Sequence, residues 1–419
     1  MIDIKYLREN AEAIQDNCLK RGSKADIKKI LELDQDYTRI LQEVEKVRAE
    51  RNVLAQKLQN ERNPEAIEKG KGLKVRLSEL EQVLEKLLIE RDQALLAVPN
   101  LSHIEAPVGE SDAENVVLKQ VGEVVQLQNP KNHMEIAEAL DLIDFERAAR
   151  VTGAKFYFLK NKLAILEQAL IRYGIDFLIR ENFEFLTTPD LAKEEVLVGK
   201  GFLPRGPEKQ VYYIEGEDLA LVGTAEIPVL GYHMSDVLDA DILPKKYVAF
   251  SHCFRTEAGS YGRESYGLYR VHQFSKVEMF AFTLPEQSEA LHQELLGHEE
   301  RFWKSLGIPF RVVDCCTGDL GGSDFRRYDL EAWMWGKNDG KGGWGEITSC
   351  SNCVDYQARG LNIKYAGKDK DRGFVHTLNG TVVATPRAMI AILENYQQPN
   401  GSVRIPDVLI PYCGFDVIK

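Results

Sequence analysis

Apolar residues in the first hundred positions recur with alternating three- and four-residue spacing. The first run consists of Ile30, Leu33, Tyr37, Ile40, Val44, Val47 and Leu54, and the second of Leu73, Leu77, Leu80, Leu84, Leu87, Ala94 and Val98. This spacing is typical of helices packed along one seam. Asn63-Pro64 separates the runs, and proline suits the first turn of a helix. The pattern predicts an antiparallel two-helix hairpin, with helices of about 32 residues and roughly 50 Å each.

Beyond the hairpin the pattern changes to a mixture of helices and strands. Residues 101–134 have the polar composition of a linker, and helices are predicted over 136–149 and 163–181. Strands are predicted over 247–255, 269–283, 310–315, 328–335 and 345–350. Alternating apolar positions and the glycines between these segments indicate an antiparallel sheet. The predicted class is α+β, without a phosphate loop or a dinucleotide-binding GxGxxG motif.

Charge is distributed unevenly along this acidic chain. Its 419 residues include 53 Lys+Arg and 65 Asp+Glu, a net charge of -12. An acidic protein binds nucleic acid only through a local basic patch. Such a surplus lies around the hairpin tip, at Lys57, Arg62, Lys69, Lys71, Lys74 and Arg76. The residues alone fit either the solvated surface of a coiled coil or an arm that contacts the phosphates of a large RNA.

The seven cysteines are an odd number in a large chain, which favours reduced thiols and a cytoplasmic location. Cys350 and Cys353 form a CxxC, and Cys315 and Cys316 could complete a four-thiolate zinc site. A CxxC without a second matching CxxC is a weak zinc signal. The early acid Asp3 is not followed by an apolar run, so we expect no signal peptide. No stretch of about 18 uncharged apolar residues occurs, so we expect no membrane span.

The most informative segment for chemistry is 254–257, followed by 270–274. It places Arg255, Glu257, Arg270 and Phe274 on two strands joined by a glycine-rich loop. Such a set can hold ATP without a phosphate loop, because arginine binds the α-phosphate, glutamate accepts from the adenine amino group and phenylalanine stacks on the purine.

Further along the second strand, Glu278 follows Phe274 by four residues. Strand alternation therefore predicts that the two side chains point to the same face. Glu278 fits either an exposed strand acid or a buried carboxylate that accepts a hydrogen bond from a small polar substrate.

Two shorter segments offer polar groups for a charged ligand. Thr224-Ala225-Glu226 fits a helix start with Thr224 as N-cap, or a site where a hydroxyl and a carboxylate hold an ammonium group. Glu346 and Ser349 could hold Mg²⁺ bridged to phosphate oxygens, because hard cations take oxygen ligands.

The last segment is a predicted helix start near the C-terminal end. Thr385 reads as the N-cap and Pro386 as the first helical residue, which puts Arg387 in the first turn. Free N–H groups and the helix dipole favour anions there, so Arg387 would make a polyphosphate clamp. The alternative is a surface arginine on an amphipathic helix, against which the nearby Asn379 and Thr381 argue.

Together these segments resemble the seryl-tRNA synthetases, a branch of the class II aminoacyl-tRNA synthetases, over nearly the whole chain. Residues 183–189 resemble motif 1, which lies at the dimer interface in that family; 254–280 resemble motif 2 and 381–397 motif 3. The resemblance implies an antiparallel-sheet catalytic domain with flanking helices, preceded by a long coiled-coil arm. It assigns 1–105 to a tRNA-binding arm and 106–419 to the catalytic domain of a homodimer.

The resemblance also implies roles for individual residues. Arg255 and Arg387 would be catalytic, and Glu346 with Ser349 would hold Mg²⁺. Serine would be bound by Thr224, Ala225, Glu226, Arg255, Glu278, Asn379 and Thr381. ATP would be bound by Arg255, Thr256, Glu257, Arg270, Val271, Phe274, Glu346, Ile347, Thr348, Ser349 and Arg387. Serine tRNA would be gripped by Lys57, Arg62, Lys69, Lys71, Lys74 and Arg76.

The implied reaction is ATP-dependent ligation of L-serine to serine tRNA through a seryl-adenylate, with selenocysteine tRNA open as a further substrate. A non-catalytic tRNA-binding paralogue would have lost ATP residues, whereas Arg255, Glu257, Phe274 and Arg387 are present. A ligase for a carrier protein would lack the hairpin. The chain departs from the family pattern at Tyr266, at Tyr269 and in the glycine-rich stretch 335–345.

Overall fold

The computed structural model describes residues 1–60, 63–202, 210–258, 266–368 and 371–419. It divides into two compact units, Met1–Pro99 and Asn100–Lys419. No helix in these described ranges combines the length and the apolar character needed to cross a membrane.

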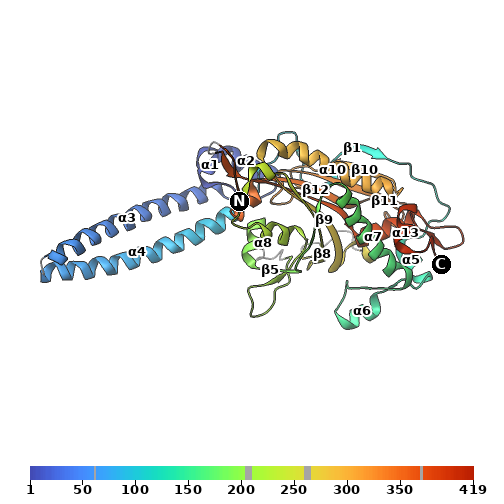
Figure 1. Cartoon of the computed structure of the whole chain (residues 1–419), viewed down its shortest axis with the longest axis horizontal. Coiled ribbons are helices and arrows are strands. Elements are labelled where there is room, and N and C mark those ends of the chain that lie inside the picture. Colours follow the sequence, from blue (N-terminus) through green and yellow to red (C-terminus); the bar gives the residue numbers. More distant parts are fainter. Residues whose placement is uncertain (61–62, 203–209, 259–265, 369–370) are drawn as a thin grey trace. The chain divides into compact units, whose positions relative to one another are not determined.

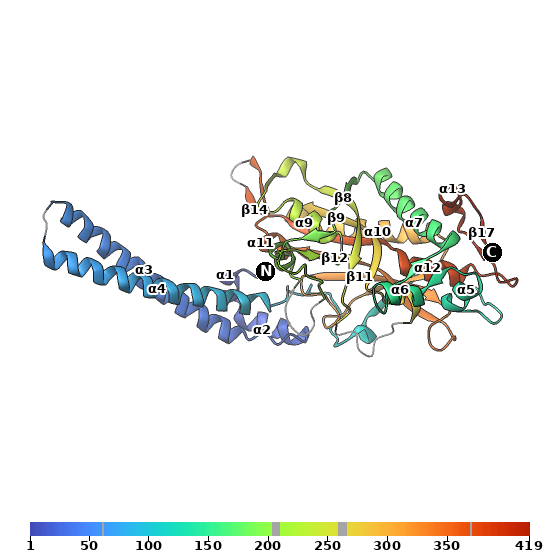
Figure 2. The ribbon, with the colours of Figure 1, turned by 90° about the horizontal axis from the view of Figure 1, so that it is seen from below.

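The first unit is a helical hairpin with two short helices before it. Its elements are α1 (Ile4–Glu9), α2 (Ala11–Lys20), α3 (Ile27–Asn60) and α4 (Pro64–Leu96). Helices α3 and α4 lie side by side in both views (Figures 1 and 2). Helix α4 begins at Pro64, and the Asn63 side chain accepts a hydrogen bond from the Glu65 N–H. The predicted hairpin is therefore confirmed, including the proline at its second helix start.

The seam of the hairpin is formed by the residues that the heptad pattern predicts. Its buried members are Ile40, Val44, Val47, Leu73 and Leu77. Asp34 is buried near the start of α3. Its carboxylate lies 2.6 Å from Arg8 Nε and 3.5 Å from Arg91 Nη1. Because a buried carboxylate is costly unless paired, these contacts fix α1, α3 and α4 together.

The second unit is built on an eight-stranded sheet with the order β1-β10-β11-β12-β15-β9-β8-β4. The strands are β1 (Val116–Val121), β10 (Phe310–Asp314), β11 (Arg326–Met334), β12 (Gly343–Val354), β15 (His376–Ala384), β9 (Gln273–Thr283), β8 (Lys245–Phe254) and β4 (Glu184–Thr187). All neighbours pair antiparallel except β4 and β8, which are parallel. The predicted antiparallel sheet is thus confirmed for every strand but the last.

Helices and small sheets surround this central sheet. The helices are α5 (His133–Ala139), α6 (Phe145–Val151), α7 (Asn161–Arg180), α8 (Glu194–Lys200), α9 (Glu226–Tyr232), α10 (Ser288–Ser305), α11 (Tyr356–Gly360), α12 (Thr385–Asn395) and α13 (Ile410–Cys413). The small strands are β2 (Ile143–Asp144), β3 (Phe158–Leu159), β5 (Leu191–Ala192), β6 (Ala220–Leu221), β7 (Val237–Asp239), β13 (Lys364–Ala366), β14 (Arg372–Phe374), β16 (Val403–Arg404) and β17 (Val417–Ile418).

Three segments differ from their predicted structure. The strand predicted over 269–283 begins only at Gln273, and Gly267–Tyr269 form a 3-10 helix, so Arg270 lies outside the strand. The predicted linker 101–134 contains β1, which pairs with β10 at the sheet edge although its side chains are mostly exposed. Its pairing depends on a distant strand, which a local pattern cannot reveal. The predicted helix 136–149 is two helices, because Asp141 takes a positive φ and the Asp144 side chain caps a new start by accepting from the Arg147 N–H.

Strand β9 separates the core from the site. Its odd-numbered residues Val277, Met279 and Ala281 are fully buried in the main hydrophobic core, which also contains residues of α7, α10 and α12. Its even-numbered Phe274 and Glu278 line pockets instead. The prediction that these two side chains share a face is confirmed, and that face carries the candidate site.

Candidate active site

Two adjoining pockets lie on the face of the sheet opposite the main core. The first is lined by Arg255, Glu257, Leu268, Tyr269, Arg270, Val271, Phe274, Lys276, Glu346, Ile347, Thr348, Ser349, Thr381, Ala384, Pro386 and Arg387. The second is lined by Lys200, Gly201, Phe202, Gly223, Thr224, Glu226, Arg255, Lys276, Glu278, Gly321, Gly322, Ser323, Asp324, Arg327, Ser349, Ser351 and Asn379. Arg255, Lys276 and Ser349 line both, so the pockets meet at these side chains.

Arg255 lies just beyond the end of β8. Its backbone N–H donates to the His272 carbonyl oxygen at 2.9 Å, and its Nε donates to the Gly223 carbonyl oxygen at 3.2 Å. The guanidinium carbon lies 5.3 Å from the centroid of the Phe274 ring, within the range of a cation–π contact. These contacts fix a positive charge where the two pockets join.

Glu257 and Arg270 form an ion pair at the rim of the first pocket. Arg270 Nη1 donates to Glu257 Oε2 at 2.6 Å. Glu257 has φ of 54°, an uncommon conformation for a residue other than glycine, and it directs the chain out of β8. Residues 259–265 lie outside the described residues.

A β-bulge in β12 explains why Glu346 and Ser349 both line the first pocket although they are three residues apart. Leu330 pairs with Thr348 and Glu331 with Glu346, so Ile347 is the extra residue that resets the alternation. Burial raises the pKa of Glu346, but the guanidinium groups of Arg387 at 2.9 Å, Arg327 and Arg255 together outweigh burial and lower that pKa. Glu346 is therefore an ionised carboxylate.

Helix α12 begins one residue earlier than predicted. Ala384 is the N-cap, and Thr385 is the first helical residue. Thr385 is not the N-cap because its hydroxyl donates instead to Glu167 Oε1 at 2.8 Å. Arg387 still lies in the first turn and lines the first pocket, with its guanidinium carbon 4.9 Å from the Tyr269 ring centroid.

Glu226 is the centre of the polar network in the second pocket. Its Oε1 accepts from Gln357 Nε2 at 2.7 Å and from Asn379 Nδ2 at 3.1 Å, and its Oε2 lies 3.2 Å from Lys200 Nζ. Helix α9 starts at Glu226 with Ala225 as the N-cap, although the Thr224 hydroxyl accepts from the Glu226 N–H at 3.2 Å. Thr224 was predicted to be the N-cap, but it lies one residue before the N-cap Ala225.

Glu278 is the second carboxylate of this pocket, and it is 2% exposed. It forms an ion pair with Lys276 and accepts a hydrogen bond from the Thr381 hydroxyl at 3.3 Å. Burial raises the pKa of Glu278, while the Lys276 ammonium opposes that rise. Of the two interpretations of Glu278, the exposed strand acid is therefore wrong.

Most of the predicted site residues line these two pockets. The exceptions are Thr256 and Ala225, which belong to neither lining. The predicted site did not include Lys200, Lys276 or Gln357, which contact its carboxylates. Lys276 could have been found, because it alternates with Phe274 and Glu278 on β9, whereas nothing local marks Lys200 or Gln357.

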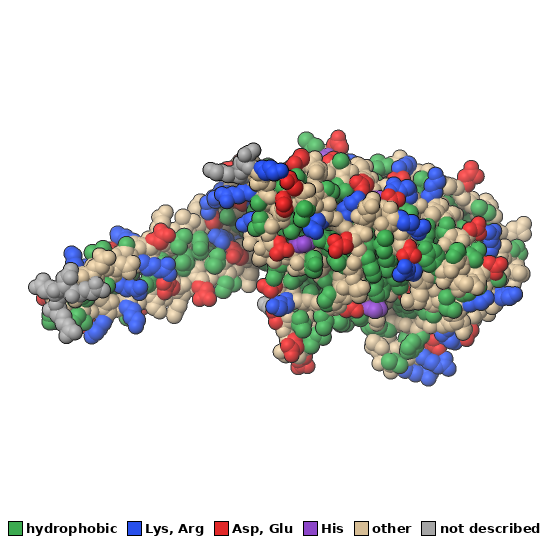
Figure 3. All heavy atoms as spheres, viewed as in Figure 1, with side chains coloured by type: hydrophobic (Ala, Val, Ile, Leu, Met, Phe, Trp, Pro, Cys, Tyr) green, Lys and Arg blue, Asp and Glu red, His purple; other side chains and the backbone are tan. Residues whose placement is uncertain are grey.

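The residues predicted to bind RNA lie on the hairpin of the first unit. The exposed ones are Lys57, Lys69, Lys71, Lys74 and Arg76, and Arg62 lies outside the described residues. Figure 3 shows Lys and Arg side chains along this hairpin.

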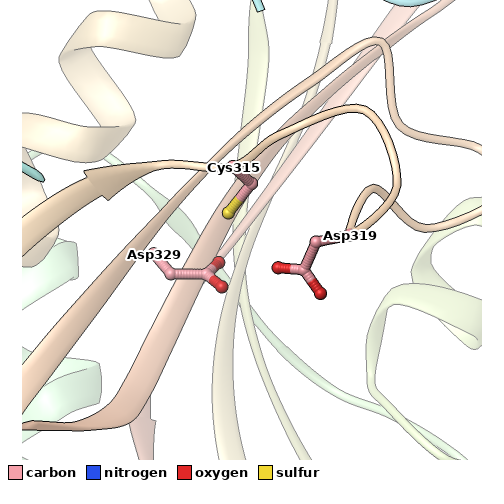
Figure 4. Close-up of side chains that lie close together, drawn as sticks. All are labelled: Cys315, Asp319 and Asp329. Atoms are coloured by element: carbon pink, nitrogen blue, oxygen red, sulfur yellow. The ribbon is translucent and has the colours of Figure 1, made fainter. Parts of the chain in front are cut away.

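Within the part of the chain that the structure describes, the cysteines do not converge as a four-cysteine zinc site would require. Among the described residues, the group of possible metal ligands that converges is Cys315, Asp319 and Asp329 (Figure 4). Arg327 already donates to Asp319 at 2.6 Å and to Asp329 at 3.0 Å. Burial raises the pKa of the Cys315 thiol, so this cluster is an ion-pair network beside a neutral thiol.

Comparisons with known proteins cover the whole chain. Residues 1–102 match the model of the seryl-tRNA synthetase N-terminal domain, and residues 211–396 match that of the class II tRNA synthetase core domain for G, H, P, S and T. A serine–tRNA ligase of Treponema denticola is 49% identical, with 100% of each chain covered.

Solved structures give the same result. The seryl-tRNA synthetase of Pyrococcus horikoshii complexed with ATP has a TM-score of 0.88 and 39% identity, and the match covers 100% of this chain and 99% of that one. A cytoplasmic serine–tRNA ligase of Naegleria fowleri in complex with AMP has a TM-score of 0.82 and 32% identity, with 99% and 97% covered.

The Lys276–Glu278 pair gives a test of the geometry that is independent of any ligand. We expect Lys276→Met to lower the free energy of unfolding by about 3 kcal/mol, because it leaves a buried carboxylate unpaired. Lys276→Met combined with Glu278→Gln should regain most of that loss. Denaturant unfolding of the single and double variants measures both values. If the loss of stability in the double variant equalled the sum of the losses in the two single variants, the two side chains would not interact.

Proposed function

The chain belongs to the seryl-tRNA synthetase family and is an ATP-dependent serine–tRNA ligase, and from this we propose that its first pocket binds ATP and its second binds L-serine. The observation that carries the proposal is that Arg255, Lys276 and Ser349 line both pockets. A serine carboxylate and an ATP α-phosphate are both anions, and they would meet at the two cations.

The first pocket suits a purine nucleotide. The Phe274 ring offers a stacking surface, and Glu257 can accept a hydrogen bond from the adenine amino group. At the other end, Arg387 offers a guanidinium at a helix N-terminus, where anions are favoured. Glu346, ionised and with a side chain 45% exposed, suits Mg²⁺ together with Ser349; the ion would neutralise phosphate charge.

The second pocket suits serine by charge and by size. Glu226 would accept from the α-ammonium group in place of Lys200, and Asn379 holds that carboxylate in position at 3.1 Å. Glu278, which accepts from the Thr381 hydroxyl of the adjoining first pocket, would take the substrate hydroxyl together with Thr381. A pocket that binds a hydroxyl rejects alanine, because its buried polar groups would remain unpaired.

Catalysis by these residues would consist of positioning and charge stabilisation. The serine carboxylate oxygen attacks the α-phosphorus of ATP, the bond to the β-phosphate breaks, and seryl-adenylate and pyrophosphate form. Arg255 would stabilise the charge that develops on the α-phosphate, and Arg387 would hold the leaving pyrophosphate. The terminal adenosine of the tRNA then takes the seryl group and releases AMP.

We also propose that the hairpin binds serine tRNA and that the enzyme is a homodimer. Exposed lysines on α3 and α4 supply local positive charge in an otherwise acidic chain, which suits contact with RNA phosphates. Strand β4 is an edge of the large sheet, and its Phe185 is 40% exposed. An edge strand with an exposed aromatic side chain suits pairing with a second copy.

The pocket assignment is tested by amino-acid-dependent exchange between ATP and pyrophosphate. We expect exchange with serine and none with alanine or threonine, and its loss when Mg²⁺ is chelated. Glu278→Ala should lower kcat/KM for serine about 100-fold, because a hydrogen bond to a charged group is lost. The exposed Glu289→Ala is the matched control. A folded enzyme that shows no exchange with any amino acid would contradict the assignment.

The arm is tested by reversing its charge. We expect a variant with Lys69, Lys71 and Lys74 changed to Glu to keep serine-dependent exchange. Its kcat/KM for tRNA should fall at least tenfold, because phosphate contacts are lost. The control reverses Lys24, Lys28 and Lys29, which are exposed near the opposite end of α3. Equal losses of tRNA charging in both variants would refute a contact at the hairpin tip.

A further inference from the structure

Outside the residues assigned above, a buried histidine and a buried glutamate connect four separate segments. His133, at the start of α5, is 4% exposed, and Glu394, in α12, is 0% exposed. Glu394 Oε1 accepts from the His133 backbone N–H at 2.9 Å and contacts His133 Nδ1 at 2.8 Å. Glu394 Oε2 accepts from the Gly336 N–H at 2.9 Å. We call these two residues the His133–Glu394 pair.

The other ring nitrogen of His133 reaches the loop that precedes β9. The Leu268 backbone N–H donates to His133 Nε2 at 3.3 Å. Since Nε2 accepts, the proton of a neutral ring must lie on Nδ1, where it is donated to Glu394. The imidazole therefore links the Glu394 carboxylate to the Leu268 backbone with every polar atom of the ring in use.

Two glycines allow the backbone to come this close. Gly267 has φ of +55°, and a Cβ there would collide with His133 Nε2 and lie 2.8 Å from Met134 Sδ. A Cβ on Gly336 would lie 2.9 Å from Glu394 Oε1. Both segments can contact the pair only because these positions lack a side chain.

The pair is joined to the ATP pocket through the residues next to it. Leu268, Tyr269 and Arg270 line the first pocket directly after Gly267. The Tyr269 ring centroid lies 4.9 Å from the Arg387 guanidinium carbon and 4.7 Å from Lys337 Nζ. Arg387 and Glu394 belong to the same helix, α12. The pair thus ties the loop end that carries Tyr269 to the helix that carries Arg387.

The same place brings together Tyr266, Tyr269 and the glycine-rich stretch 335–345. Tyr266 contacts the His133 ring edge-on, with centroids 5.8 Å apart. Tyr269 contacts Arg387, and the glycine-rich stretch 335–345 supplies Gly336 and Lys337. These residues therefore lie together around one buried pair.

We propose that His133 and Glu394 are positioning residues for ATP: they hold Leu268–Arg270 and α12 in the arrangement that presents Tyr269 and Arg387 to the triphosphate. The proposal rests on the assignment of the first pocket to ATP. It predicts that changes to the pair weaken ATP binding and leave serine binding unchanged. Among the described residues, those that line the second pocket are different from those that surround the pair.

Two substitutions of His133 separate positioning from general stability. In His133→Asn the amide can replace Nδ1 as donor to Glu394, but it is too short to reach Leu268. In His133→Gln the amide oxygen can take the place of Nε2 and accept from Leu268. We expect His133→Asn to raise KM for ATP about tenfold, because a displaced substrate-binding group weakens binding, with KM for serine within about twofold and His133→Gln close to wild type.

The measurement is serine-dependent ATP–pyrophosphate exchange with either substrate varied. His298→Asn is the control, because His298 is 2% exposed, lies within 3.4 Å of Glu294 and lines neither pocket. Tyr269→Leu should raise KM for ATP in the same way, and it tests the proposal even if His133→Asn does not fold. Equal effects of His133→Asn and His133→Gln, or a parallel rise of both KM values, would overturn the proposal. An inactive wild type would instead overturn the ATP assignment itself.

Discussion

The alternation of side chains along β9 is the constraint on which the site depends. Strand β9 pairs with β8 on one side and β15 on the other, so a shift in register would exchange its core and pocket residues. Val277, Met279 and Ala281 are held in the core by their burial. Lys276 and Glu278 are consequently forced into the pocket, opposite Thr381 and beside Arg255. The hydrophobic core thus determines where the charges of the site lie.

Charges placed on that face must be neutralised when no substrate is bound, because isolated buried ions are unstable. Each carboxylate that lines the two pockets meets a cation: Glu278 meets Lys276, Glu226 meets Lys200, Glu346 meets Arg387, Glu257 meets Arg270, and Asp324 meets Arg327. These partners keep the pockets polar and preorganised. A charged substrate would exchange one ion pair for another, which limits the desolvation cost of binding and leaves the geometry in place for reaction.

Much of this organisation could be predicted because it is local. The heptad residues predicted the hairpin, and strand alternation predicted that Phe274 and Glu278 share a face. Most of the residues assigned by family resemblance line the two pockets. The missed features depend on distant pairing. Strand β1 forms by pairing with β10. Thr385 does not act as the N-cap because its hydroxyl donates to Glu167. Lys200 and Gln357 contact Glu226 from two different helices. No local pattern marks contacts between residues more than a hundred positions apart, such as His133 and Glu394.

The two pockets act as one continuous site joined at Arg255, Lys276 and Ser349. Calorimetric titration with a non-hydrolysable sulfamoyl analogue of seryl-adenylate tests it most directly, with ATP and serine titrated separately for comparison. We expect the analogue to bind at least 100-fold more tightly than either substrate, because it fills both pockets at one entropic cost. Arg255→Met should remove most of this advantage. An analogue that binds no more tightly than ATP alone would show that the two pockets are not one continuous site.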